Sequence, residues 1–138
     1  MTKDFLLRLT EEHYGAGAFP VYGRLLEEQR LTRGGPLLPM WYCTAALRRA
    51  FGGENVLVLG CTNDSLLAHL LGATPVNPLP PHYYCPNCHH LIFDGHADNG
   101  WDLPDLACPE CGTPMAADGH NLRSRSLIGE SVVSLQVP

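Results

Sequence analysis

The sequence of 138 residues lacks a hydrophobic run that could cross a membrane, since no apolar stretch approaches the about 20 residues that a spanning helix needs. It also lacks an N-terminal basic segment followed by an apolar stretch, which is the pattern of an export signal. With 45% hydrophobic and 17% charged residues, the composition is typical of one globular domain. We therefore expect a cytoplasmic protein with one modest core and no membrane partner.

Positive charge is missing from the middle of the chain. Residues 50–122 contain no Lys or Arg and eight Asp or Glu, whereas residues 1–49 contain seven Lys or Arg. Affinity for the nucleic-acid backbone depends on Lys and Arg that neutralise phosphates, so the middle segment is predicted to repel it. A DNA-binding face would have to use arginines outside this segment: Arg24, Arg30, Arg33, Arg48, Arg49, Arg123 and Arg125.

Four of the six cysteines form two Cys-x-x-Cys pairs. Cys85 and Cys88 are separated from Cys108 and Cys111 by nineteen residues, a spacing typical of zinc ribbons. Proline follows the first cysteine of each pair and Gly112 follows the last, as tight turns prefer. Four thiolates complete a tetrahedral zinc site, so we predict one structural Zn²⁺. A single iron that carries electrons is the alternative.

The other cysteines, the histidines and the aromatic residues are predicted to have structural or solvent-exposed positions. Cys43 and Cys61 lie in apolar stretches, which favours buried, inert thiols. Because four cysteines already complete the metal site, the neighbouring histidines are expected to be exposed to solvent: His82, His89, His90, His96 and His120. Aromatic residues are expected to fill cores: Trp41, Tyr42, Tyr83 and Tyr84.

Apolar periodicity predicts helices over about residues 2–13, 20–31 and 36–50, with Thr2 as the first cap. The second helix is expected to place polar residues on its outer side: Arg24, Glu27, Glu28 and Arg30. Residues 56–59 predict a strand, followed by a turn and a helix over 65–71, and residues 131–137 predict another strand. The proline-rich stretch 76–81 cannot be helical.

The stretch Val76-Asn-Pro-Leu-Pro-Pro-His-Tyr-Tyr-Cys-Pro-Asn-Cys88 resembles the zinc-binding insertion in the polymerase core of PolC-type DNA polymerase III alpha subunits, which are C-family replicative polymerases. The resemblance continues, in the same order, through Trp101-Asp-Leu-Pro-Asp105, Cys108-Pro-Glu-Cys-Gly-Thr-Pro114 and Asp118-Gly-His-Asn121. Residues 14–71 are colinear with that family at lower similarity. This resemblance implies an α+β fold, namely a small α/β palm-like fragment with an inserted four-cysteine ribbon.

The resemblance also implies three parts of the chain. Residues 1–75 would form a helical and strand-turn-helix lobe resembling part of the polymerase palm, and residues 76–122 the zinc ribbon. Residues 123–138 would contain a C-terminal strand that returns to the first lobe.

The turn at residues 60–65 matches a Gly/Ser-rich loop that holds nucleotide phosphates in the resembled family. Only Gly60 and Ser65 keep that pattern, while Leu59 occupies the family's arginine position and Asp64 adds a negative charge. Backbone donors bind phosphate well only where no such charge opposes them. We therefore expect no nucleotide-binding residues.

Residues 132–137 match a family strand that carries two catalytic aspartates. Ser134 and Gln136 occupy those two positions. Two-metal phosphoryl transfer needs carboxylates to hold its cations, and neither a hydroxyl nor an amide supplies that charge. The sequence also ends before the family's third carboxylate. We expect no catalytic residues and no enzymatic activity.

These observations favour a non-catalytic zinc-binding protein derived from a PolC-type polymerase, acting as a protein-interaction module in DNA replication. A phage or mobile-element setting is one version of this hypothesis, and the protein partner is unidentified. A nucleic-acid-binding zinc ribbon is the alternative, with weak binding expected from the scattered arginines. A polymerase fragment completed by another polypeptide is the second alternative, and a remnant without selected function is the last.

Overall fold

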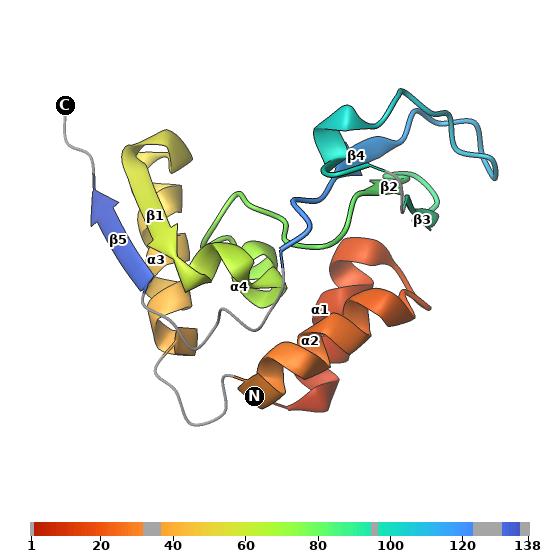
Figure 1. Ribbon diagram of the computed structural model, residues 1–138. Coiled ribbons are helices and arrows are strands. Elements are labelled where there is room, and N and C mark those ends of the chain that lie inside the picture. The colour runs from red at the N-terminus through yellow and green to blue at the C-terminus, as the bar shows by residue number, and fades with distance from the viewer. Residues whose placement is uncertain (1, 32–36, 95–96, 123–130, 136–138) are drawn as a thin grey trace.

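The computed structural model describes residues 2–31, 37–94, 97–122 and 131–135 of an α+β protein (Figure 1). Four α-helices are described: α1 (Lys3–Tyr14), α2 (Phe19–Leu31), α3 (Leu37–Phe51) and α4 (Leu66–Leu71). The strands are β1 (Val56–Gly60), β2 (His82–Tyr84), β3 (Leu91–Phe93), β4 (Ala116–Asp118) and β5 (Ser131–Leu135). Short 3₁₀ helices are η1 (Gly53–Asn55), η2 (Cys61–Asp64) and η3 (Gly100–Asp102). The predicted fold class is confirmed.

Side chains fix the helix ends where the sequence predicted them. The Thr2 hydroxyl accepts a hydrogen bond from the Phe5 amide at 3.2 Å and begins α1. The Ser65 hydroxyl accepts one from the Ala68 amide at 3.0 Å and begins α4. Each cap satisfies a backbone donor that the helix itself leaves without a partner.

The hydrophobic core joins all four helices. Helix α4 lies between α3 and the α1–α2 pair (Figure 1), and Leu66 and Leu67 are almost completely buried there. Trp41 of α3 has no exposed surface, and its indole N–H donates to the Thr62 hydroxyl at 3.0 Å. We call α1–α4 together with β1 and β5 the helical lobe.

Strands β1 and β5 form a two-stranded antiparallel sheet beside α3 (Figure 1). The register places Leu57 opposite Ser134 and Val58 opposite Val133. Val56 and Val58 point inward, whereas Leu57 and Leu59 are about half exposed. The predicted strands are therefore confirmed over 56–59 and 131–135, and positions 136–137 lie outside the described residues.

Strands β2, β3 and β4 form a separate antiparallel sheet in which β2 is central. We call residues 82–118 the ribbon. The stretch 76–81 contains no helix or strand and connects α4 to β2, as its prolines predicted. Among the described residues, no helix is both long enough and apolar enough to cross a membrane.

Two predictions of burial in α3 were wrong. Cys43 is exposed, and Tyr42 keeps 49% of its surface exposed. Trp41, Thr44 and Ala45 face the core, and with about 100° of rotation per residue the positions between them must face outward. The predicted burial of Cys61 is confirmed.

Candidate metal centre

The four predicted cysteine ligands come together at one end of the ribbon. Their Sγ atoms all lie within 4.8 Å of one another. The Sγ atoms of Cys85 and Cys111 are 3.5 Å apart, as are those of Cys88 and Cys108. Zinc–sulfur bonds of about 2.3 Å in a tetrahedron place sulfurs roughly 3.8 Å apart, so the cluster has the size of a four-thiolate metal site. These sulfurs could hold a metal ion.

Both Cys-x-x-Cys turns have the same backbone geometry. In the first turn the His89 amide donates to the Cys85 carbonyl at 3.0 Å, and in the second the Gly112 amide donates to the Cys108 carbonyl at 2.8 Å. His89 and Gly112, which directly follow the second cysteine of each pair, both have positive φ, at 66° and 77°. Glycine adopts this conformation without a steric penalty, whereas His89 does not.

Each turn buries its first cysteine and exposes its second. Cys85 and Cys108 are almost completely buried, while Cys88 and Cys111 are exposed. The sulfur separations exclude disulfide bonds, which need about 2.05 Å. Side-chain hydrogen bonds with Thr113 and then with Asn87 lower the pKa of Cys111 to about 5. The lowered pKa favours a thiolate, the metal-binding form, at Cys111. At Cys88 a backbone hydrogen bond involving His90 acts in the same direction, but the Cys108 sulfur and burial outweigh it and raise the pKa to about 12.

Helix α1 supports the first turn of the metal centre by close contact. A Cβ added to Gly15 would lie 2.5 Å from the Cβ of His89, and Gly15 also has a φ of 82°. The Tyr84 hydroxyl is hydrogen-bonded to the His89 ring, and the Tyr14 ring meets Tyr84 edge-on at 5.2 Å between centroids. A side chain at position 15 would therefore displace the ribbon from α1. His89 is exposed, as predicted.

His82 lies in a buried hydrogen-bonded chain, so the prediction that it is exposed was wrong. It has 1% of its surface exposed, its Nδ1 lies 2.8 Å from the Pro80 carbonyl, and its Nε2 lies 3.3 Å from the Tyr14 hydroxyl. The Asn77 amide donates to that hydroxyl at 2.7 Å. Burial lowers the pKa of His82 below its usual range, while the bond to Pro80 opposes this. The chain joins α1 to β2.

The remaining predictions for histidines and aromatic residues have mixed outcomes. His90 and His120 are partly buried, and His96 lies outside the described residues. The Trp101 ring, which is 69% exposed, meets His120 edge-on at 4.3 Å between centroids. Tyr83 is buried, as predicted, and its hydroxyl donates to the Pro104 carbonyl.

The turn that matches a phosphate loop is occupied by the carboxylate of Glu28. This group accepts hydrogen bonds from the Leu66 amide at 2.7 Å, the Leu67 amide at 3.0 Å and the Ser65 hydroxyl at 2.8 Å. Arg24 pairs with Glu28 at 2.8 Å and also donates to the Asp64 carbonyl at 2.7 Å. The first backbone donors of α4 therefore already have partners.

The predicted outward orientation of Glu28 was wrong. Its side chain has no exposed surface, and this burial raises its pKa against the opposing hydrogen bonds and Arg24. Glu28 follows Val21 and Leu25 at helical spacing, and both are completely buried. That spacing was the signal in the sequence that could have identified Glu28 as an inward residue.

Further hydrogen bonds stabilise the turn at residues 60–65 from within the protein. The Asn63 amide donates to the Val58 carbonyl at 2.9 Å, and the Thr74 hydroxyl donates to the Asn63 side-chain oxygen at 2.5 Å. Gly60 begins the turn with a φ of 90°. Asn63 and Asp64, two of the residues that depart from the Gly/Ser-rich pattern, thus take part in internal hydrogen bonds, Asn63 through its side chain and Asp64 through its backbone carbonyl.

The two positions that match catalytic aspartates are only partly described. Ser134 lies in β5 opposite Leu57 and is half-buried, while Gln136 lies outside the described residues.

In the described part of the chain, the cysteine cluster is the one group of three or more His, Cys, Asp or Glu side chains close enough to hold a metal ion.

The arginines that a nucleic-acid face would need are partly engaged within the protein. Arg24 is bonded to Glu28 and to the Asp64 carbonyl, and Arg48 donates to the Gly72 carbonyl at 2.8 Å. Arg30 and Arg49 are exposed. The other three lie outside the described residues: Arg33, Arg123 and Arg125.

Comparison with known proteins identifies relatives named PolC-type DNA polymerase III. The chain is 50% identical over 72 residues, 51% of its length, to a DNA polymerase III PolC-type protein of Bacillus subtilis (strain 168). It is 39% identical over 113 residues, 79% of its length, to that of Latilactobacillus sakei subsp. sakei (strain 23K). It is 49% identical over 72 residues to that of Halalkalibacterium halodurans. No protein-family model matches the chain.

These matches cover little of the relatives themselves. The matched part corresponds to 5% of the Bacillus subtilis protein and 8% of the Latilactobacillus sakei protein. The chain is therefore homologous to a small segment of PolC-type DNA polymerase III.

Proposed function

We propose that this homologue of a segment of PolC-type DNA polymerase III is a non-catalytic zinc-binding protein that acts by contacting another protein in DNA replication. The main support for the non-catalytic role is the set of hydrogen bonds that the Glu28 carboxylate accepts at the start of α4. A triphosphate at the start of α4 would need backbone donors at Leu66 and Leu67, which already bind the Glu28 carboxylate. Incoming phosphate would therefore meet a buried negative charge.

The metal is proposed to be zinc with a structural role. Four thiolates leave no open coordination position, so the ion would organise the ribbon and would not activate a substrate. Cys85 and Cys108 would hold it from the buried side, and Cys88 and Cys111 from the solvent side. Zinc would supply the charge that lets four neighbouring sulfurs all remain deprotonated.

The strand β5 supports a role without catalysis. Ser134 stands where the resembled family has one catalytic aspartate, and its hydroxyl cannot neutralise a divalent cation. Binding to nucleic acid is less favoured than binding to protein, because Arg24 and Arg48 are engaged in internal hydrogen bonds.

The test is calorimetric titration of zinc-loaded protein with deoxynucleoside triphosphates and magnesium, together with a primer-extension assay. No saturable binding and no extension are expected. Matched titrations use Glu28→Gln, which removes the negative charge at similar size. Saturable binding by the wild-type protein at micromolar triphosphate would overturn the non-catalytic proposal, and tight salt-resistant DNA binding would favour the nucleic-acid alternative.

A further inference from the structure

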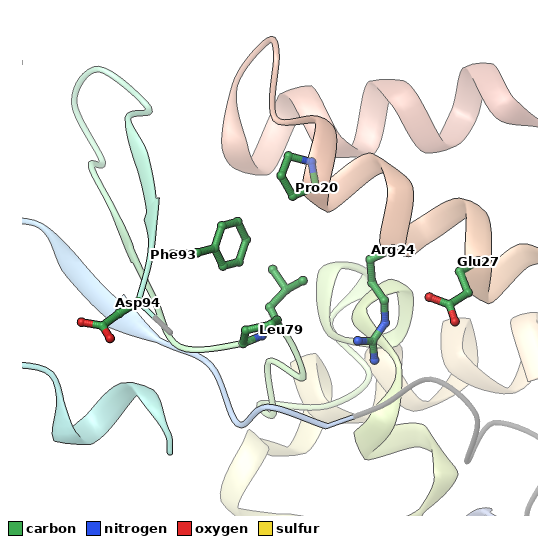
Figure 2. Close-up of a pocket in the computed structure, with 7 residues that line it drawn as sticks. Pro20, Arg24, Glu27, Leu79, Phe93 and Asp94 are labelled. Atoms are coloured by element: carbon green, nitrogen blue, oxygen red, sulfur yellow. The ribbon is translucent and has the colours of Figure 1, made fainter. Parts of the chain in front are cut away.

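An apolar pocket of about 380 Å³ opens between α2 and the ribbon (Figure 2). Pro20 lines it from α2, Leu79 and Pro80 line it from the connection to β2, and Phe93 lines it from β3. Phe93 keeps 36% of its surface exposed. The pocket volume lies within the about 300 to 1,000 Å³ of typical ligand pockets. It can receive a bulky apolar side chain.

The charges at the two ends of this pocket are negative. Glu27 lies on α2 beyond Arg24, and Asp94 lies beside Phe93 at the opposite end (Figure 2). Arg24 lines the same wall, but its guanidinium is paired with Glu28 at 2.8 Å and donates to the Asp64 carbonyl. The pocket therefore disfavours an anionic ligand, such as a phosphate group.

Asp94 also lines a second hollow, of similar volume, whose other acidic residues are Asp98 and Asp102. The apolar pocket and the acidic hollow meet at this residue. The surrounding segment, residues 50–122, contains no Lys or Arg. The combined surface thus presents an apolar recess followed by carboxylates.

We propose that this combined surface is the docking site for a protein segment in which bulky apolar residues lie next to Lys or Arg residues. The apolar side chain would bury its surface against Pro20 and Phe93, which supplies affinity through the hydrophobic effect. The basic residues would lie along Asp98 and Asp102, which supplies orientation and charge complementarity. This inference rests on the proposed role in protein binding and names the chemistry of the partner.

The probe is a set of fluorescein-labelled peptides with two apolar positions, drawn from Leu, Ile, Phe and Trp, and three adjoining positions of Lys or Arg, made in both sequence orders. Binding to the zinc-loaded full chain is measured by fluorescence anisotropy at low and physiological salt. We expect saturable binding that weakens with salt. Matched peptides with Ser at the apolar positions, or Glu at the basic positions, are expected not to bind.

Two pairs of variants test whether the peptide binds at the proposed surface. Asp98→Lys should weaken binding of the tightest-binding peptide by about fivefold. Glu54→Lys makes the same charge change at an exposed residue of η1 and should leave binding unchanged. Phe93→Ala should weaken it by about tenfold, whereas Phe51→Ala, at an exposed phenylalanine of α3, should not. Zinc content and thermal unfolding of each variant show that the fold is kept.

The inference is overturned if no peptide of the set binds, or if Asp98→Lys and Glu54→Lys weaken binding equally. It is also overturned if the Glu-substituted peptides bind as well as the basic ones. These failures leave the proposed function intact, since that is tested by triphosphate titration and primer extension. Conversely, triphosphate binding with no peptide binding would overturn both.

Discussion

The helical lobe and the ribbon bury their side chains in different ways. The helical lobe has completely buried residues from four helices, among them Leu6, Leu25, Trp41 and Leu66. The ribbon has three strands of three residues each, and two of its buried side chains are the candidate ligands Cys85 and Cys108. Short strands without a large apolar face are marginal by themselves. The first region is stabilised by packing, whereas we propose that the second needs a metal ion bound by its four cysteines.

Removing one of the four cysteines, or the metal itself, should have the largest effect and should act on the ribbon alone. Cys108→Ala, or chelation of zinc, is expected to unfold the ribbon, because metal binding contributes on the order of 10 kcal/mol to such sites. Helical far-UV dichroism should remain, while near-UV signals from Tyr83 and Trp101 should be lost.

Metal analysis of the same samples should give one zinc per wild-type chain. Cys43→Ala is the control, since Cys43 is exposed and lies outside the cluster. An apo protein that kept its near-UV spectrum and its unfolding temperature would contradict a structural metal.

Loss of the buried carboxylate should have the next largest effect, this time on the helical lobe. Glu28→Ala leaves the backbone donors of Leu66 and Leu67 and the charge of Arg24 without their partner. Breaking a buried pair costs about 3 to 5 kcal/mol. Urea unfolding followed by far-UV dichroism measures the loss. Glu27→Ala, one position along the same helix and exposed, should change little.

A cavity in the core of the helical lobe should cost somewhat less. Leu67 has 1% of its surface exposed, so Leu67→Ala is expected to lower the free energy of unfolding by about 3 kcal/mol. Zinc content should remain unchanged, because the cavity lies outside the ribbon. Leu57→Ala, at a residue that is 45% exposed, is the matched control. Loss of zinc from Leu67→Ala would show that the two regions are not independent.

The smallest expected effect concerns the contact between the two regions and depends on pH. Burial holds the pKa of folded His82 below its usual value of 6.5, so above that pH the full stability is present. As pH falls below 6.5, the unfolded chain binds a proton that the folded chain resists, and stability decreases by at most about 1.4 kcal/mol per pH unit. His69, whose pKa is also lowered by burial, acts in the same direction.

Urea unfolding of the zinc-saturated protein between about pH 7 and about pH 5.5 measures this slope. His82→Gln should reduce it, since glutamine does not titrate. His90→Gln is the control, because the His90 side chain is not part of the described hydrogen-bonded chain that joins α1 to β2. An unchanged slope in His82→Gln would assign the pH dependence to other groups.

Local patterns in the sequence were sufficient for the four α-helices, for β1 and β5 and for the ligand set, but not for the short strands β2, β3 and β4. The helices, the strand-turn-helix order and each Cys-x-x-Cys pair depend on residues that lie within a few positions of each other. The matching turn geometry follows from Cys-Pro-x-Cys, and the pairing of the two turns was indicated by the nineteen residues between them. The caps at Thr2 and Ser65 are likewise local. Boundaries for the three parts of the chain stay a prediction.

The sequence by itself determined which residues form helices, which cysteines gather and where charge is missing, because spacing and composition carry that information. Only the tertiary structure decided that the Glu28 carboxylate bonds to the backbone of α4 and that His82 is bonded to Tyr14. These contacts join residues 39 and 68 positions apart. No local period specifies such pairs, since they depend on how helices pack once their apolar faces are buried. The pocket beside Phe93 likewise exists only because α2 and β3 meet there.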